Sequence, residues 1–188
     1  YLSFSFMAYL WFLLLNHFGL VNYKNNLLTP LLGSVIAERK SIWTVHSGAL
    51  WFVSCLFCTE LLFYFIAKIG RTKKAIGSLL LVTSVVGCLY NKMVGQPLPW
   101  NIDVAMISVG FYGAGYLFKE YNKNLERFNH LKSLVLLLIV NLFTGYLNYV
   151  LTGERVDFYN SSLGNIVLFY LSAFSGIGAF VILIKHMK

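Results

Sequence analysis

Six long apolar segments recur along the chain, each close to the length of a membrane-spanning helix. A helix needs roughly 20 apolar residues to cross the hydrocarbon core of a bilayer. A membrane β-barrel would alternate apolar and polar positions instead, and this chain does not. The pattern therefore predicts an all-α fold: a polytopic transmembrane helix bundle of about six helices, forming a single domain over residues 1–188. The segments are Tyr1–Leu20, Ala49–Ile69, Ala75–Val94, Ile102–Phe118, Ser133–Leu151 and Gly164–Ile184.

Three of the stretches between these segments carry structural signals. Gly70–Lys74 is short enough to be a tight hairpin. Gln96–Trp100 holds two prolines, which lack a backbone donor, and is expected to form a stiff turn. Thr29–Ala37 is expected either to dip into the membrane or to lie flat at its surface.

The composition, 58% hydrophobic with only 12% charged residues, agrees with a membrane protein, and the distribution of charge adds an orientation. Ten of the 15 cations follow the second, fourth and sixth segments: Lys68, Arg71, Lys73, Lys74, Lys119, Lys123, Arg127, Lys132, Lys185 and Lys188. The positive-inside rule places these loops and the C-terminus in the cytoplasm of a multi-pass cell-membrane protein. The net charge of +8 is thus explained by topology, with the lipid bilayer as partner and no nucleic acid.

The first segment has neither a Met start nor a basic region before it. Since its inferred entry is from the cytoplasmic side, we expect the chain to be truncated at its N-terminus, with an even number of helices preceding Tyr1.

Glu60 is the leading candidate for chemistry, because it falls near the middle of the second segment. A carboxylate there costs about 2.5–3.5 kcal/mol on insertion scales, so it is expected to face the bundle or a wet cavity. Tyr64, one turn later, is placed to hydrogen-bond it. Glu60 is either a proton acceptor or substrate ligand, or a buried carboxylate that locks two helices together.

Asn141, Thr144 and Asn148 form a polar stripe on one face of the fifth segment. The stripe either lines a path for a hydroxylated substrate or makes interhelical hydrogen bonds, and the second interpretation is preferred. Asn101 and Asp103 open the fourth segment, where an N-cap and an acid in the first turn suffice to explain them.

Other candidate residues are weaker. His17 and His46 are more simply interfacial residues than bases. Cys55, Cys58 and Cys88 fall inside predicted helices, without the loop that a zinc site requires, and are interpreted as small apolar fillers. The sequence contains no Ser-His-Asp pattern, no metal-ligand cluster and no nucleotide fingerprint, so no metal is expected.

Several stretches carry a resemblance to a known family. Gly48–Tyr64 resembles the Leu-Trp-Phe-Leu segment of the membrane-bound acyltransferase 3 family. Leu98–Asp103 and Gly110–Leu117 resemble that family's Pro-Trp-polar-Leu-Asp turn and aromatic-Gly-Tyr helix, and Gly164–Ser172 fits its closing segment. The order and spacing of these motifs over about Leu50–Lys188 make the resemblance to the family specific, and Tyr1–Ser47 is compatible with it. Within the family, the chain most resembles the fucose 4-O-acetylase-like branch.

The resemblance implies an enzyme of typically ten helices. Such an enzyme moves an acetyl group from cytoplasmic acetyl-CoA, a co-substrate and not a bound cofactor, to a hydroxyl of a cell-surface sugar, a polysaccharide or its lipid-linked precursor. The family's arginine and histidine in and before its first helix have no counterpart here, so the main catalytic residues are expected upstream of Tyr1 and this chain alone is expected to be inactive.

Within that interpretation, Glu60 takes a supporting catalytic role. Trp51, Trp100 and Asn141 are candidate substrate-binding residues. The alternatives are a transporter or flippase for a glycan or small polar solute, and a non-catalytic membrane subunit. A transporter tends to show inverted repeats and broken helices, which the sequence lacks.

Overall fold

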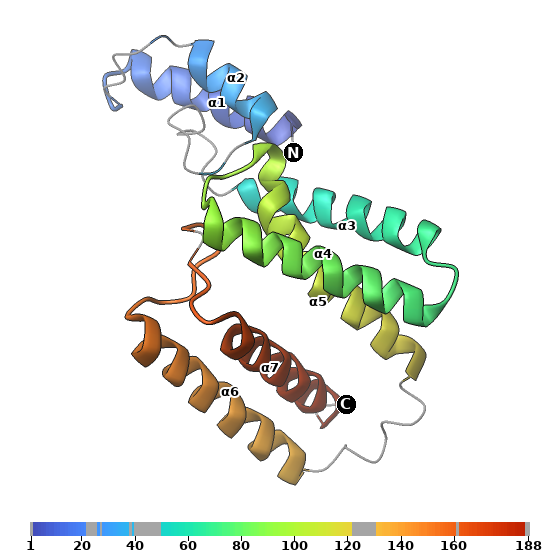
Figure 1. Ribbon diagram of the computed structural model, residues 1–188. Coiled ribbons are helices and arrows are strands. Elements are labelled where there is room, and N and C mark those ends of the chain that lie inside the picture. The colour runs from blue at the N-terminus through green and yellow to red at the C-terminus, as the bar shows by residue number, and fades with distance from the viewer. Residues whose placement is uncertain are drawn as a thin grey trace. The chain divides into compact units, whose positions relative to one another are not determined.

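A computed structural model describes residues 2–21, 26, 28–37, 39, 50–121, 131–160 and 162–186, and within that part the regular structure is helical (Figure 1). The chain divides into two compact units, residues 1–112 and 113–188, which are described separately below. The predicted helical fold is confirmed, and each of the six apolar segments forms a helix. These are α1 (Leu2–His17), α3 (Trp51–Ile69), α4 (Lys73–Met93), α5 (Ile102–Tyr121), α6 (Leu131–Thr152) and α7 (Ile166–His186).

Four of these helices, α3, α4, α6 and α7, are long and apolar enough to cross a membrane. α3 has 19 residues, and at about 1.5 Å per residue it is about 28 Å long, close to the hydrocarbon thickness of roughly 30 Å. α1 has 16 residues and is a shorter apolar helix. α5 has 20 residues, with Asp103 in its first turn and Lys119 in its last, and is not among these four.

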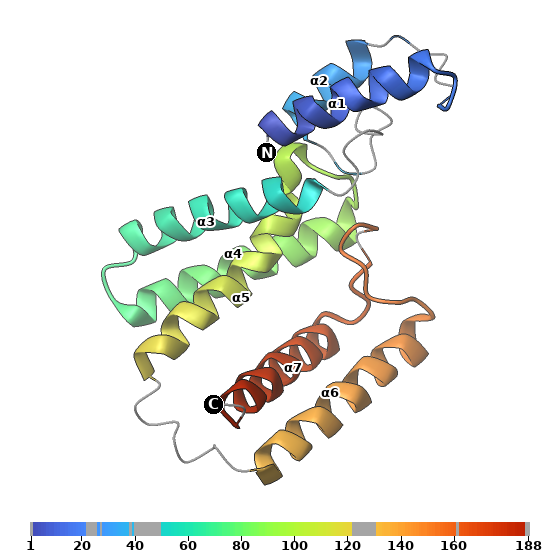
Figure 2. The same ribbon diagram turned by 180° about the vertical axis from the view of Figure 1, so that it is seen from behind.

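The stretch predicted to dip into the membrane or lie flat forms a further helix, α2 (Leu28–Ile36). α2 packs against α1 in the first unit, where both are drawn in blue (Figures 1 and 2). Pro30, Gly33 and Ser34 of α2 are buried, as are Ser5, Tyr9 and Phe12 of α1.

The predicted tight hairpin joins α3 to α4. Gly70 ends α3, and its N–H donates to the carbonyl of Ile66. A Cβ on Gly70 would lie 2.6 Å from Cγ1 of Ile76, so the turn has no room for a larger residue. Thr72 then caps α4, since its hydroxyl accepts from the N–H of Ala75.

The start of α5 is the most deeply buried helical stretch of the first unit. Ala105, Ile107 and Val109 are completely buried. α5 crosses close to α4 at Gly87, where an added Cβ would lie 2.8 Å from Cβ of Met106, and Figure 2 shows this crossing from behind. Asp103, which precedes these residues in the first turn of α5, is likewise buried at 1% exposure.

The second unit is built on the antiparallel pair α6 and α7, which lie side by side in both views (Figures 1 and 2). Gly178 allows this close approach, because its missing Cβ would lie 3.2 Å from Leu137. The loop between the two helices turns back on itself through a backbone pairing of Asp157 with Ser162.

Candidate functional site

A buried ion pair joins Arg39 to Asp103 in the first unit. Nη1 of Arg39 donates to Oδ1 of Asp103 at 2.9 Å, and Nη2 donates to Oδ2 at 2.5 Å. The side chains are 0% and 1% exposed. Two parallel N–H···O bonds of this kind are the strong, geometrically specific form of the arginine–carboxylate pair.

Asn101 extends this pair into a larger network. Its Nδ2 donates to the carbonyl of Ala37 at 2.8 Å, to Oγ of Ser54 at 3.0 Å and to the carbonyl of Trp51 at 3.3 Å. Its Oδ1 accepts from both the backbone N–H and Nη1 of Arg39. We call Arg39, Ser54, Asn101 and Asp103 the Arg39 cluster.

The Arg39 cluster ties three separate stretches of the first unit together. They are the residues just after α2, the first turn of α3 and the first turn of α5 with the segment before it. That preceding segment is held as well, because the N–H of Leu98 donates to Oδ1 of Asp103 at 3.3 Å. Removing one member of a buried ion pair typically lowers the free energy of unfolding by about 3–5 kcal/mol. The Arg39 cluster is therefore expected to fix the local geometry firmly.

The sequence placed Asn101 and Asp103 correctly at the start of a helix but assigned them the wrong partners. The side-chain bonds of Asn101 in the described part of the chain all go to other segments, so it does not act as an N-cap. Asp103 is paired with an arginine 64 residues away in sequence, rather than only facing the positive end of its own helix.

The backbone next to the cluster is strained. Trp100 has φ 58° and ψ 13°, and Asn101 has φ 57°, which is the left-handed region. For a bulky residue such as Trp100 this conformation costs roughly 1–2 kcal/mol, whereas asparagine adopts it more readily. The two residues belong to a short 3-10 helix, Pro99–Asn101, which is the form that the predicted stiff turn takes.

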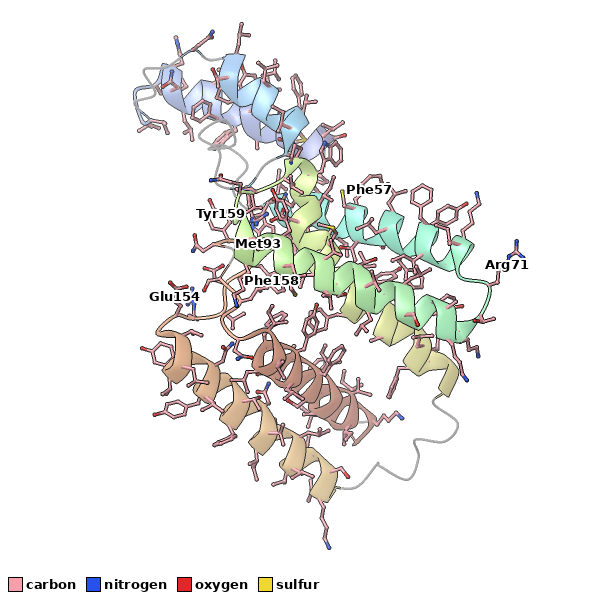
Figure 3. All side chains as sticks on the ribbon, viewed as in Figure 1. Phe57, Arg71, Met93, Glu154, Phe158 and Tyr159 are labelled. Atoms are coloured by element: carbon pink, nitrogen blue, oxygen red, sulfur yellow. The ribbon has the colours of Figure 1, made fainter. Side chains whose placement is uncertain are left out.

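Both tryptophans predicted to bind substrate lie beside the cluster. Trp100 is half-buried, and its ring centroid is 5.9 Å from that of Phe57, the α3 residue labelled in Figure 3. Trp51 is half-buried as well, and its carbonyl accepts from Ser54 and Asn101. Their substrate-binding role stays a prediction, but the structure brings both residues to the N-terminal half of α3.

Glu60 lies near the middle of α3, as the sequence predicts, but it is not buried. Its side chain is exposed on α3, and it makes no hydrogen bond or ion pair with another described residue. The expected bond from Tyr64 is not formed, because Tyr64 is 56% exposed and its ring lies under Nζ of Lys68 at 5.9 Å. The predicted burial of Glu60 is therefore not met by the described residues, since Glu60 is not among the buried residues of α3.

Asn141 and Asn148 hold the second unit together. Nδ2 of Asn141 donates to the carbonyl of Ser172 at 2.7 Å, and Oγ of Ser172 donates back to the carbonyl of Asn141 at 3.2 Å. Asn148 donates to the carbonyl of Leu163 and accepts from the N–H of Asn165. Thr144 donates to its own helix at Val140. The preferred interpretation of the polar stripe, interhelical hydrogen bonding, is confirmed for Asn141, whereas Asn148 bonds the loop just before α7. A substrate role for Asn141 stays a prediction.

The remaining candidates are less informative. His17 is exposed at the end of α1, and His46 lies outside the described residues. Cys55, Cys58 and Cys88 are buried free thiols in the helices, which agrees with their interpretation as fillers. Among the described residues, no group of three His, Cys, Asp or Glu side chains is placed to hold a metal ion.

The cations of the α3–α4 hairpin lie at the other end of α3 from Trp51. Lys68, Arg71, Lys73 and Lys74 are exposed, and Arg71 projects away from the turn in Figure 3. A positive patch and the Arg39 cluster are thus separated by the length of one membrane-spanning helix.

Arg39 is the residue that sequence reasoning missed. In the sequence it is only one of the five Lys and Arg residues that do not follow the second, fourth or sixth apolar segment. A usable signal was present: besides Glu60, Asp103 is the acidic residue within an apolar segment, and a carboxylate there requires a cationic partner.

One comparison with known proteins gives a match. A family model described as an acyltransferase domain, that of acyltransferase 3, matches residues 1–187. Searches of curated proteins and of solved structures give no match.

Proposed function

We propose that this chain, which belongs to the acyltransferase 3 family, transfers an acetyl group from acetyl-CoA to a hydroxyl of a cell-surface sugar or polysaccharide. Family membership over residues 1–187 makes the protein an acyltransferase, and the four apolar helices make it a membrane protein. The family match is the observation that carries the reaction class. Acetyl as the transferred group and a sugar as the acceptor rest on the motif resemblance at Gly48–Tyr64 and Leu98–Asp103.

The proposed chemistry is a thioester-to-ester exchange. The acceptor hydroxyl oxygen attacks the thioester carbon, the C–S bond breaks, an ester C–O bond forms, and the hydroxyl proton ends on the released CoA thiol. Such a reaction needs a base for that proton and donors for the oxyanion. We propose a supporting role for Glu60, either at the acceptor site or in orienting a basic residue outside the described part of the chain.

The charge distribution supports donor binding at one end of α3 and acceptor binding at the other. The exposed cations Lys68, Arg71 and Lys74 fit the phosphates of CoA by charge, and a patch of one sign raises the local concentration of an oppositely charged ligand. The same cations follow from cytoplasmic topology. In this proposal the hairpin faces the cytoplasm and the donor, and Trp51, Trp100 and the Arg39 cluster face the acceptor.

The direct test is acetyl transfer by the protein expressed from its intact gene and reconstituted in lipid nanodiscs. With labelled acetyl-CoA and a panel of polysaccharides and simple sugars, we expect O-acetyl ester and free CoA in equal amounts. If folded protein forms no ester with any acceptor but exchanges labelled solute across vesicles, the acetyl-transfer proposal fails and a transport activity replaces it.

Glu60→Gln tests the proposed supporting role. We expect it to lower kcat by about 10²-fold, the lower range for a general acid–base group. Glu154→Gln is the matched control, since Glu154 is an exposed carboxylate in the α6–α7 loop, labelled in Figure 3, and is expected to leave kcat unchanged. An unchanged kcat in Glu60→Gln would remove Glu60 from the mechanism without touching the reaction class.

A further inference from the structure

We propose that Arg39, Asn101 and Asp103 are positioning residues, which hold the ring of Trp100 as a platform for the acceptor sugar. This inference rests on the proposed function, because it names the residues that shape the acceptor side of the same reaction. Neither the motif resemblance nor the family match assigns a role to Arg39.

The first observation is the backbone at Trp100. Four described glycines, Gly19, Gly95, Gly153 and Gly164, have φ between 64° and 71°, the left-handed region where glycine is unstrained. Trp100 adopts φ 58° with a bulky side chain. The chain therefore has an aromatic residue at a position where glycine would have less backbone strain. Strained residues persist only where their surroundings over-determine them, and they gather at functional sites.

The second observation is the set of hydrogen bonds that hold the strained backbone of Trp100 in place. Asn101, the next residue, is fixed by hydrogen bonds to Ala37, Ser54 and Arg39. Asp103 fixes the segment on the other side of Trp100 through the N–H of Leu98. Arg39 joins the two anchors, because it binds Asp103 and Asn101 together. The hydrogen bonds of the cluster thus fix the backbone on both sides of Trp100.

The third observation is the ring itself. Trp100 is half-buried, with Phe57 tilted against it at 52°, so part of the indole surface stays accessible. A sugar ring has faces of C–H groups, and burying such a face on an aromatic ring removes apolar surface from water. Small-molecule sites commonly combine aromatic walls with a few fixed polar groups. Here the Arg39 cluster has its polar atoms committed to one another, so it serves as support and the ring is the contact surface.

The test separates acceptor binding from the rest of the reaction in the intact protein. We expect Trp100→Ala to raise the acceptor KM about tenfold while the KM for acetyl-CoA and its acceptor-independent hydrolysis stay unchanged. Trp100→Phe should restore most of the affinity. Trp11→Ala is the control, because Trp11 is 63% exposed on α1 and should change neither KM.

Arg39→Lys tests the positioning step, since lysine keeps the charge but cannot form the two parallel bonds. We expect a rise of about fivefold in acceptor KM with an unchanged donor KM. An acceptor KM that stays constant in both Trp100→Ala and Arg39→Lys overturns the inference. So does an equal loss of donor hydrolysis and acceptor transfer, which is the result of a merely structural role.

A second readout does not depend on acetyl transfer. With Trp11, Trp43, Trp51 and any tryptophan outside residues 1–188 changed to Phe, the quenching of Trp100 fluorescence by acrylamide reports how its ring is held. We expect quenching to increase at least twofold on adding Arg39→Lys, and no change on adding Arg155→Lys. Equal quenching in all three proteins contradicts the positioning role even if transfer is observed, whereas absence of transfer with the expected quenching contradicts only the proposed function.

Discussion

The two units use buried polar side chains in different ways. In the first unit, the Arg39 cluster contains a full ion pair and connects three separate stretches of chain. In the second, neutral amides and hydroxyls such as Asn141 and Ser172 connect two neighbouring helices. Interhelical hydrogen bonds of the second kind are worth about 0.6 kcal/mol each in membranes. Losing one partner of a buried ion pair lowers the free energy of unfolding several times more. The comparison therefore indicates that substitutions in the Arg39 cluster destabilise the protein more than substitutions between α6 and α7.

The largest expected effect comes from breaking the ion pair. Asp103→Leu leaves a buried arginine without its carboxylate, and we expect the free energy of unfolding to fall by about 3–5 kcal/mol, measured by chemical unfolding in mild detergent. Arg155→Leu is the matched control, because Arg155 lies 3.8 Å from Asp157 but is 86% exposed. For this exposed pair we expect less than about 1 kcal/mol. Equal losses in the two variants would mean that Arg39 and Asp103 are not a buried pair in the folded protein.

A smaller effect is expected at the turn into α7. Gly164 has φ 66°, and an added Cβ would meet the side-chain amide of Asn148, with Cγ at 3.0 Å. Gly164→Ala is therefore expected to cost about 2–3 kcal/mol, from backbone strain plus displacement of Asn148. Gly153→Ala is the control, since Gly153 has φ 71° with nothing within 4 Å. It should lose only the strain, about 1–2 kcal/mol, and a Gly153 variant as unstable as the Gly164 variant would argue against the packing of Asn148.

A smaller loss of stability is expected from removing the hydrogen bonds between α6 and α7. A double-mutant cycle with Asn141→Ala and Ser172→Ala is expected to give a coupling free energy of about 0.6 kcal/mol, and at most about 1.7 kcal/mol. The unfolding free energies of the four proteins supply this value. A coupling of zero would show that the hydrogen bonds between these two residues do not stabilise the helix pair.

The smallest effect concerns Asp157 in the α6–α7 loop. The side-chain hydrogen bond from Asn160 lowers the pKa of Asp157 below 3.8, helped by the N–H groups of Asn160 and Tyr159 and by nearby Arg155. Because the folded pKa is depressed, the stabilisation is present above the unfolded pKa and is lost as the pH falls through the folded value. Asn160→Ala should raise the pKa toward 3.8, as followed by carboxyl NMR titration, and an unchanged pKa would rule out Asn160 as the main cause.

The polar pattern of the second unit was readable from sequence for a physical reason. Asn141 and Asn148 lie one above the other on a single helix, and a periodic stripe on an apolar helix predicts that a neighbouring helix meets it. Their partners, Ser172 and Leu163, belong to the next helix and the loop before it. Local spacing therefore predicted the face that packs and, for Asn141, the bond to a neighbouring helix, but not that Asn148 bonds the loop.

The Arg39 cluster could not be predicted from local spacing in the sequence. Its ion pair joins residues 64 apart, and Arg39 lies outside any apolar segment, where a cation is usually only a topological charge. Glu60 shows the opposite failure: its position inside an apolar helix predicted burial, but helix periodicity alone did not reveal that it lies on the exposed side of α3. Helices and their lengths follow from composition, whereas long-range pairing depends on how the helices pack.

The central claim, that donor and acceptor meet the protein at opposite ends of α3, is tested most directly by sidedness. In sealed vesicles, Arg71→Cys labelled with a membrane-impermeant maleimide identifies the side that the α3–α4 hairpin faces, since the native cysteines that the structure describes are buried. Labelled acetyl-CoA, which does not cross the bilayer, is then supplied on one side only, with acceptor polysaccharide on both. The account predicts ester formation only when acetyl-CoA is on the hairpin side, with the product on the other side. Ester formed on the side that holds acetyl-CoA, or donor use from the side opposite the hairpin, would contradict it.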